Sequence, residues 1–302
     1  MKNKILLSIV VVLLPITIIM LKKQVTPLNQ DNKESLNKPI IYIDLLINNE
    51  KKQIPLEEYL VNVVGAEVPA LFDMEALKSQ AVASRTFALY QENTRGYVTT
   101  NDQAYNSLEE LQQKWQDNYY TYLKRITDAV NVTKNQVITY NKKLIKSYFY
   151  AMSNGYTTTS LSVFNETLPY LNTIMPTSDN ETNTKFKVTK KVSKDEFCKT
   201  LNIACAALNI NNIITDYSNR IETISINKKT YTGIEIRKKF NLRSTDFTIT
   251  VENNDIIFTT KGYGHGVGMS QYGANAMAKE GSNYKDILEY YYQGVTIEEY
   301  KI

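Results

Sequence analysis

Hydrophobic and polar residues follow a helical period in some stretches of this chain and alternate in others. Residues 108–130 carry apolar residues at helical spacing, together with the only tryptophan, Trp115, which predicts a helix. Residues 135–149 alternate, which predicts a β-hairpin with its turn at residues 141–143. Residues 40–47 are rich in β-forming residues and are followed by an Asn-Asn-Glu turn, so we expect the folded part to begin there.

Two further helices are predicted in residues 55–90. The first begins at Pro55, a favoured residue of a first helical turn, and ends near residue 66, because a residue before proline avoids helical dihedrals. Asp73 has the character of an N-cap, and residues 74–90 are rich in Ala, Leu, Gln and Lys. The two helices therefore flank a short loop that contains Glu67.

Glu67 is a lone carboxylate in an apolar run, between Val63-Val64-Gly65-Ala66 and Val68-Pro69. Apolar surroundings and the end of a helix both disfavour the ionised form, so they favour a carboxyl group that stays protonated for general-acid chemistry. The competing interpretation is that Glu67 is a solvated surface residue without a functional role, since isolated glutamates at helix ends are usually solvated. Lys78 and Arg85, two helical turns apart, point off one face. They could reach the acid, hold an anionic part of a substrate, or form an ordinary polar face.

Residues 185–249 are predicted to form an inserted lobe of mixed structure, with a helix at 193–201, a strand at 220–226 and a short helix at 233–240. It contains the only two cysteines, Cys198 and Cys205. On one continuous helix their Cα atoms would be about 10.5 Å apart, too far for a bridge. We therefore expect buried free thiols, although a disulfide would become feasible if Asn202 ended the helix.

Four glycines alternate with other residues at positions 262–268 and precede two predicted helices, at 270–279 and 284–293. The pattern is neither a dinucleotide-binding fingerprint nor a Walker loop, but it lets a backbone pass close to a large ligand such as a sugar chain. His265 is the only histidine, which excludes a zinc site made of several imidazoles. It could orient a substrate, hydrogen-bond the catalytic carboxyl group or brace the loop.

Residues 1–23 have lysines at both ends and an uncharged apolar run between them, which predicts an uncleaved single-pass membrane anchor. Residues 24–39 are polar and contain two prolines, as expected of a linker. The formal net charge of +4, from 35 basic and 31 acidic residues, is too balanced to suggest a nucleic-acid partner. Residues 40–302 would then form one extracytoplasmic domain.

Two long motifs, residues 65–86 (GAEVPALFDMEALKSQAVASRT) and residues 262–294, closely resemble the signature of the stage II sporulation protein D / LytB family. Shorter matches at residues 102–105, 129–140, 153–157 and 242–247 follow in the family's order. Catalytic members are lytic transglycosylases that cut peptidoglycan glycan strands without a cofactor. The resemblance implies that Glu67 is the catalytic acid and that Gln103, Tyr105 and Gln271 contact the sugar. Lys78, Arg85 and His265 are the other candidate substrate-binding residues.

The resemblance also implies a setting at the cell membrane, a role in engulfment during sporulation, a preference for glycans stripped of stem peptides, and two partners: a peptidoglycan amidase and a membrane scaffold. Some members bind metal near residues 153–157, but this chain has no Cys or His there, so we expect no metal. Two alternatives stay open. One is a non-catalytic wall-binding activator of an amidase; the other is a muramidase that pairs Glu67 with Glu75, Asp73 or Asp102.

The fold class expected from these patterns is α+β, with helices and antiparallel hairpins around one cleft. Residues 55–90 and 262–294 should meet at that cleft.

Overall fold

The computed structural model describes residues 40–173, 175–177, 179 and 183–301. The predicted anchor and linker lie outside these residues. Within them, no helix combines the length and the apolar character that crossing a bilayer requires. The described part is α+β, as predicted, and its strand pairs are mostly antiparallel.

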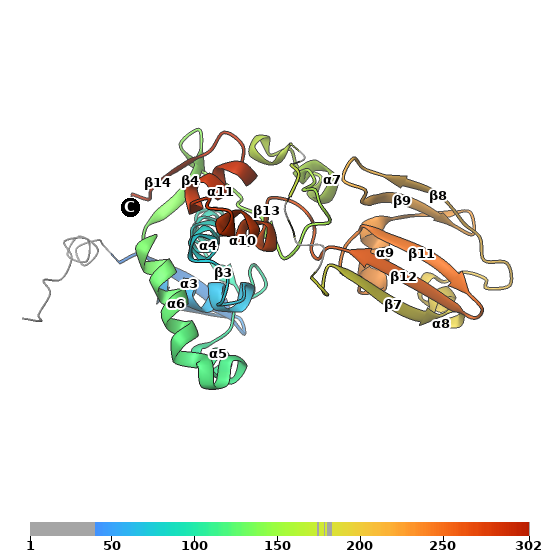
Figure 1. The fold of residues 1–302 in the computed structure, drawn as a ribbon, viewed down its shortest axis with the longest axis horizontal. Coiled ribbons are helices and arrows are strands. Elements are labelled where there is room, and N and C mark those ends of the chain that lie inside the picture. Colours follow the sequence, from blue (N-terminus) through green and yellow to red (C-terminus); the bar gives the residue numbers. More distant parts are fainter. Residues whose placement is uncertain (1–39, 174, 178, 180–182, 302) are drawn as a thin grey trace, which may run out of the picture. The chain divides into compact units, whose positions relative to one another are not determined.

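The first part of the chain supplies a helical core with small sheets at its edges (Figure 1). In chain order its elements are β1 (Tyr42–Ile47), β2 (Glu50–Pro55), α3 (Leu56–Glu67), α4 (Met74–Arg95), β3 (Val98–Thr99), α5 (Leu108–Trp115), η2 (Gln116–Asn118), α6 (Tyr119–Val132), β4 (Gln136–Tyr140), β5 (Lys143–Leu144), β6 (Phe149–Tyr150), α7 (Ser160–Phe164) and η3 (Pro169–Leu171).

The last residues of the chain return to this core. Their elements are β13 (Met269–Ser270), α10 (Gln271–Lys279), α11 (Tyr284–Tyr291) and β14 (Thr296–Glu299). Strand β14 pairs with β4 and β13 pairs in parallel with β6, so the C-terminal residues complete sheets begun earlier in the chain.

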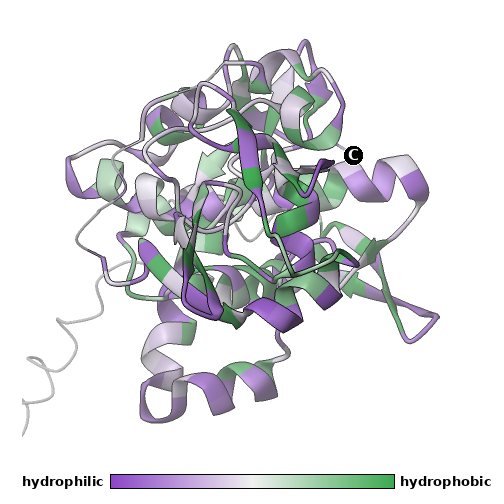
Figure 2. Ribbon diagram, turned by 90° about the vertical axis from the view of Figure 1, so that its right-hand side faces the viewer, coloured by the Kyte–Doolittle hydropathy of each residue, from purple (hydrophilic) through white to green (hydrophobic). Residues whose placement is uncertain are grey.

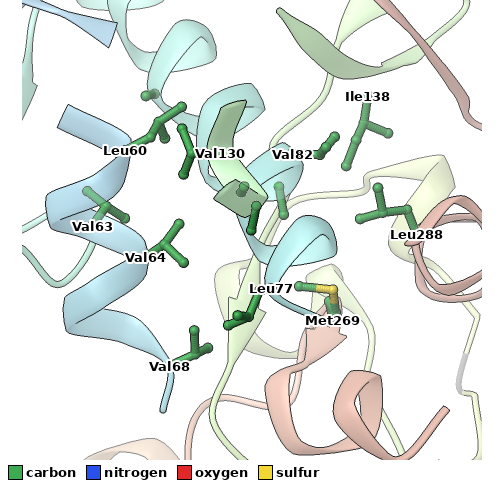
Figure 3. Packing of buried hydrophobic residues seen from close by; sticks show 14 of the residues in the cluster. Leu60, Val63, Val64, Val68, Leu77, Val82, Val130, Ile138, Met269 and Leu288 are labelled. Carbon is green, nitrogen blue, oxygen red and sulfur yellow. The ribbon is translucent and has the colours of Figure 1, made fainter. Parts of the chain in front are cut away.

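Helix α4 is the centre of this core. Thirteen of its residues, from Ala76 to Leu89, are buried, and helices α3, α6, α10 and α11 pack around it. Figure 3 shows Leu77 and Val82 of α4 among side chains from α3, α6, β4, β13 and α11. Along the helices and strands, hydrophobic and hydrophilic residues alternate in Figure 2, as expected of elements with one buried side.

Local signals placed most of these elements correctly. Asp73 is the N-cap of α4 and accepts a hydrogen bond from the Glu75 amide, as predicted. The turns at Asn48-Asn49 and Asn141-Lys142 both have positive φ at two successive residues, the geometry that joins tight antiparallel hairpins. Strand β2 was not predicted; its exposed, charged residues gave no alternation to recognise.

The helix predicted at residues 108–130 is wrong in one respect, because it is two helices. α5 ends at Trp115, and Gln116 adopts φ 48°, which a continuous helix cannot contain. The single turn η2 then leads into α6. The break lets Trp115 pack edge-on against Tyr122 of α6, with ring centroids 5.9 Å apart. Since both halves keep helical periodicity, the sequence pattern alone does not reveal the break.

A second hydrophobic core is built from residues 187–261. Its elements are β7 (Lys187–Ser193), α8 (Lys194–Leu201), β8 (Ile210–Thr215), β9 (Ile221–Ile226), β10 (Lys229–Thr232), α9 (Gly233–Lys239), β11 (Phe247–Glu252) and β12 (Asp255–Lys261). Phe197, Phe240 and Phe258 stack at its centre. Because β12 pairs with both β7 and β11, the strands that cover this core continue past residue 249 to Lys261.

Cys198 and Cys205 form a disulfide, so the expectation of free thiols is wrong. Helix α8 ends at Leu201, and Asn202 adopts the left-handed conformation at its C-cap, φ 51°. This reversal brings the two Cα atoms to 5.7 Å, within bridging range. Asparagine tolerates that conformation better than most residues, so Asn202 was the local signal for the reversal.

Removing the disulfide is expected to loosen residues 187–261 without unfolding the α4 core. The double substitution of Cys198 and Cys205 by alanine should lower the stability of this region by about 2 kcal/mol, because the bridge closes a short loop. Hydrogen exchange would locate the loss. Faster exchange in α8 and β7 with unchanged protection in α4 is the expected pattern, and uniform loss in both cores would contradict it.

Candidate active site

Glu67 is the last residue of α3, where the chain leaves the helix. Val68 is extended, and Pro69 follows it, so the helix stops there for the reason read from the sequence. The Lys114 ammonium donates hydrogen bonds to the carbonyls of Gly65, at 3.0 Å, and Ala66, at 3.3 Å, and so satisfies the last turn. The half-buried Glu67 side chain is therefore held at a fixed helix end, with a cation beside it.

Both carboxylate oxygens of Glu67 accept hydrogen bonds from other parts of the chain. The Ala104 amide donates to Oε1 at 2.7 Å, and the Gln271 side-chain amide donates to Oε2 at 3.0 Å. Gln271 is the first residue of α10, just after the glycine loop. Residues 55–90 and 262–294 thus meet at Glu67, as the sequence predicted, and the loop at residues 102–105 joins them.

Glu67 opens onto a groove of about 480 Å³, which we call the Glu67 groove. Aromatic and cationic side chains make up much of its wall. It is lined by residues 66–71 and by Lys114, Trp115, Tyr122, Ala151, Met152, Lys185, Arg243, Tyr263, Gln271 and Tyr272. Among the residues the structure describes, Glu67 is the single carboxylate in this lining.

A smaller cavity of about 210 Å³, the inner cavity, also includes Glu67 in its wall. Its other lining residues are Phe87, Asp102, Gln103, Ser147, Tyr148, Phe149, Phe164 and His265. The catalytic candidate and the glycine-loop histidine therefore share one cavity.

The pKa of the Glu67 carboxyl group is raised above that of an ordinary glutamate. Burial is the largest cause, and the hydrogen bonds from Ala104 and Gln271 and the charge of Lys114 partly oppose it. A raised pKa keeps the carboxyl group protonated to higher pH, which is what a general acid requires. The apolar residues next to Glu67 in the sequence indicated this direction.

Replacing Lys114 by methionine is expected to move the alkaline limb of the pH profile of kcat/KM upward. The cation lowers the Glu67 pKa, so removing it raises that pKa further, and the acid is then lost only at higher pH. The measurement is the rate of the reaction that depends on Glu67 across the pH range, with Lys124→Met on the exposed face of α6 as the matched control. A limb that stays in place or moves to lower pH would count against an acid role for Glu67.

His265 braces the glycine loop. Its Nδ1 accepts a hydrogen bond from the Val267 amide at 3.1 Å, and a second bond links the ring to the Phe149 backbone. Burial, then the nearby Arg237 and Arg220, lower the imidazole pKa to about 3, so the ring is neutral at physiological pH. Of the three roles left open by the sequence, loop bracing is the one these contacts support.

Gln103 and Tyr105 lie near Glu67 but turn toward the protein. Gln103 is 5% exposed and donates to the Ser84 carbonyl at 3.3 Å and to the Tyr59 hydroxyl at 3.4 Å. Tyr105 stacks on Tyr59, and its hydroxyl accepts a hydrogen bond from Asn62 at 2.9 Å. Their contacts position the loop whose Ala104 amide binds Glu67. Gln271, in contrast, touches Glu67 and lines the groove.

Lys78 and Arg85 are not brought to the groove. Arg85 is 0% exposed and forms an ion pair with Glu57 in the core, so it is a core residue rather than the substrate contact that the sequence predicted. Lys78 pairs with Glu75 at 2.6 Å and lies over the Tyr284 ring. The helical face that they share packs against other helices. The spacing of two cations in the sequence does not show whether such a face is buried or exposed.

The carboxylates considered as a second catalytic group are engaged elsewhere. Asp73 caps α4, and Glu75 binds Lys78 and the Tyr284 amide. Asp102 lines the inner cavity, but its Oδ2 accepts from the Thr99 amide, the Thr99 hydroxyl and the Arg95 guanidinium. All three therefore have structural partners that compete with a role as base.

Most groove residues were not predicted from the sequence, among them Lys114, Arg243 and Tyr263. Arg243 lies over the Tyr263 ring, 4.4 Å from its centroid, and Tyr263 is 46% exposed. Tyr263 lies between two glycines in the sequence. This position could have indicated an exposed aromatic side chain on a turn of the backbone. Lys114 and Arg243 reach the groove only through tertiary packing, so nothing in their neighbours marks them.

No group of three or more His, Cys, Asp or Glu residues suited to a metal ion is found among the described residues.

Comparison with known proteins gives consistent relatives. The family model described as "Stage II sporulation protein" matches residues 48–140. The chain is 40% identical over 264 residues to "Stage II sporulation protein D" of Bacillus subtilis (strain 168), covering 83% of this chain and 77% of that protein. The protein of the same name from Bacillus amyloliquefaciens is 39% identical, with 83% and 76% covered. The "Amidase enhancer" of Bacillus subtilis (strain 168) is 29% identical, with 80% of this chain and 40% of that protein covered.

Proposed function

Because this chain belongs to the stage II sporulation protein D family, we propose that it is a lytic transglycosylase that cuts peptidoglycan glycan strands. The observation that carries the proposal is the position of Glu67. It is one carboxylate with a raised pKa in a groove walled by aromatic and cationic side chains. Ordinary glycosidases need a second carboxylate, whereas a lytic transglycosylase uses a hydroxyl group of its own substrate.

In the proposed reaction Glu67 begins as the protonated acid. It gives its proton to the oxygen that bridges N-acetylmuramic acid and N-acetylglucosamine, and the bond from the muramic C1 to that oxygen breaks. The resulting carboxylate takes the proton of the muramic C6 hydroxyl, whose oxygen bonds to C1 and closes a 1,6-anhydro ring. Protons balance within one residue, and Glu67 returns to its starting state.

The surroundings of Glu67 suit both halves of this cycle. Burial favours the neutral acid before cleavage, while the Ala104 amide, the Gln271 amide and Lys114 stabilise the carboxylate that cleavage creates. Tyr263 and Tyr272 offer aromatic surface on which sugar rings can lie. The groove therefore combines a proton donor with a carbohydrate-like lining.

The setting is also a proposal. We place the domain outside the cytoplasm, held to the cell membrane by residues 1–23 and the linker 24–39, where it would act in engulfment on glycans stripped of their stem peptides. A peptidoglycan amidase that removes those peptides and a membrane scaffold are the proposed partners.

The experiment that tests the proposal is mass spectrometry of the products after the full chain is incubated with glycan strands already treated with an amidase. Anhydromuramic ends are the expected result. Reducing ends would instead indicate hydrolysis and a second carboxylate, with Asp102 of the inner cavity as the first to examine.

A second candidate, a non-catalytic activator of an amidase, is favoured by the 29% identity to the "Amidase enhancer". The two functions separate in one assay. An activator would bind glycan, release no glycan fragments alone and increase peptide release by an added N-acetylmuramoyl-L-alanine amidase. The carboxyl group with a raised pKa in the groove favours catalysis, because binding alone has no use for it.

A further inference from the structure

A third cavity, which we call the arginine cavity, is lined in part by His265, which also lines the inner cavity. It has a volume of about 690 Å³ and shares Phe164 and His265 with the inner cavity. Its remaining lining comes from α7 and from residues 216–245, and consists of Ser162, Val163, Asp216, Arg220, Ile221, Glu222, Thr232, Ile234, Arg237 and Thr245. The inner cavity and the arginine cavity are therefore neighbours that share part of their walls.

Arg220 is held in this cavity with unused hydrogen-bonding capacity. The residue is only 3% exposed, and its Nε and Nη1 have no acceptor among the residues that the structure describes. Its Nη2 donates to the Asn154 side chain at 3.3 Å. Leaving a buried guanidinium donor unpaired is costly, so an acceptor from outside the described residues is expected to complete it.

The glycine loop is shaped to admit this guanidinium. A Cβ on Gly266 would lie 2.5 Å from Arg220 Cζ, and Gly266 has φ +88°, a conformation that a side chain would strain. Glycine at this position therefore serves the close approach of the loop backbone to Arg220.

Arg237 adds a second positive charge to the cavity. Its Nε donates to the Leu242 carbonyl at 3.3 Å, and its guanidinium pKa is lowered by burial and then by the nearby Arg220. The same two arginines also help to lower the pKa of His265. The pKa values of Arg237 and His265 are therefore both lowered in part by the positive charge of Arg220.

The carboxylates near Arg220 form no ion pair with it among the described residues. Asp216 lines the cavity, but Oδ1 accepts from the Ser218 and Arg220 amides and Oδ2 accepts from the Thr158 hydroxyl. Asp246 accepts from the Asn154 side chain. Neither forms a salt bridge with Arg220 among the described residues. Arg220 therefore has no ion-pair partner among the described residues, although Asp216 and Glu222 also line the cavity.

We propose that Arg220 and Arg237 form a subsite that binds a carboxylate of the glycan, the lactyl carboxylate of a muramic acid whose stem peptide has been removed. A planar carboxylate matches the fork of guanidinium donors. In a strand that still carries stem peptides, this group is an amide without charge, so the subsite would read the product of the amidase step. The assignment of the carboxylate to muramic acid rests on the proposed function.

The test is a binding measurement on the full chain carrying Glu67→Gln, so that no probe is cut. The probes are a peptide-free tetrasaccharide of alternating N-acetylglucosamine and N-acetylmuramic acid, and the same tetrasaccharide with its lactyl carboxylates converted to carboxamides. The parent should bind the carboxylate form about tenfold or more tightly. Adding Arg237→Met or Arg220→Met should reduce this ratio to nearly one by weakening the carboxylate form alone.

Lys238→Met is the matched control, since Lys238 is the exposed cation next to Arg237 on α9 and should leave the ratio unchanged. If the buried Arg220 variant does not fold, the half-exposed Arg237 variant decides the matter. Equal affinity of the parent for both probes, or a preference that survives Arg237→Met, would overturn the subsite. Failure of the unsubstituted chain to make anhydro ends would instead remove the transglycosylase proposal and leave this binding result standing.

Discussion

Replacing Glu67 by glutamine is expected to lower the release of fragments with anhydromuramic ends by about 10²- to 10⁴-fold, the range that a positioned general acid contributes. Glutamine keeps the shape of the side chain but has no acidic proton to give to the bridging oxygen. Its carbonyl can still accept the Ala104 amide, and the Gln271 amide can turn to present its oxygen to the new NH₂ group. Glycan binding should therefore persist, and a titration with cleavage-resistant glycan would show it.

The matched control for this substitution is Glu58→Gln. Glu58 lies on the same helix, is exposed, and undergoes the same loss of charge, so its release rate should stay within a fewfold of the unsubstituted chain. Release at an undiminished rate in Glu67→Gln would take Glu67 out of the mechanism. Loss of both cleavage and binding would show instead that the substitution had disturbed the groove.

The position of Glu67 at a helix end in apolar surroundings was predictable, because residues next to it in the sequence determine it. Pro69 ends α3 directly after it, its neighbours in sequence are apolar, and the Asp73 cap starts α4 a few residues later. Gln271 could be paired with it only through the family resemblance, since the two residues are 204 positions apart. The Ala104 amide has no side-chain signature at all, so this second partner required the structure.

Residues that depend on packing were predicted poorly. Lys114 reaches the Glu67 groove because α5 turns away at Gln116, and the helical period of residues 108–130 continues through that break. The disulfide required Asn202 to reverse the chain, a conformation that asparagine permits without dictating. Arg220 follows an ordinary turn in the sequence, and only the approach of Gly266 reveals why it is buried.

A cation near an acid in the sequence can be either a substrate contact or part of an internal ion pair, and Arg85 is the second case. A cation on a helix beside an acid suggested a substrate contact, yet its guanidinium is used up inside the protein. It donates to both oxygens of Glu57, at 2.9 and 2.5 Å, and to the carbonyls of Val130, at 3.1 Å, and Gln136, at 3.2 Å. Arg85 thereby joins α3, α4, the end of α6 and the start of β4.

Substituting Arg85 by methionine is accordingly expected to destabilise the fold by about 3–5 kcal/mol, because it leaves the partly buried Glu57 carboxylate without its cation and two carbonyl groups without this donor. The melting temperature should fall by roughly 10 °C.

Glu57→Gln should also destabilise the fold, and the double variant should lose less stability than the sum of the two single variants, since neither charge is then left alone. Lys124→Met, which breaks an exposed pair with Asp128, is the control and should cost under about 1 kcal/mol. Unchanged melting of Arg85→Met together with weakened glycan binding would return Arg85 to the substrate; a lower melting temperature with unchanged glycan affinity would establish it as the ion pair that holds the helices behind Glu67 in place.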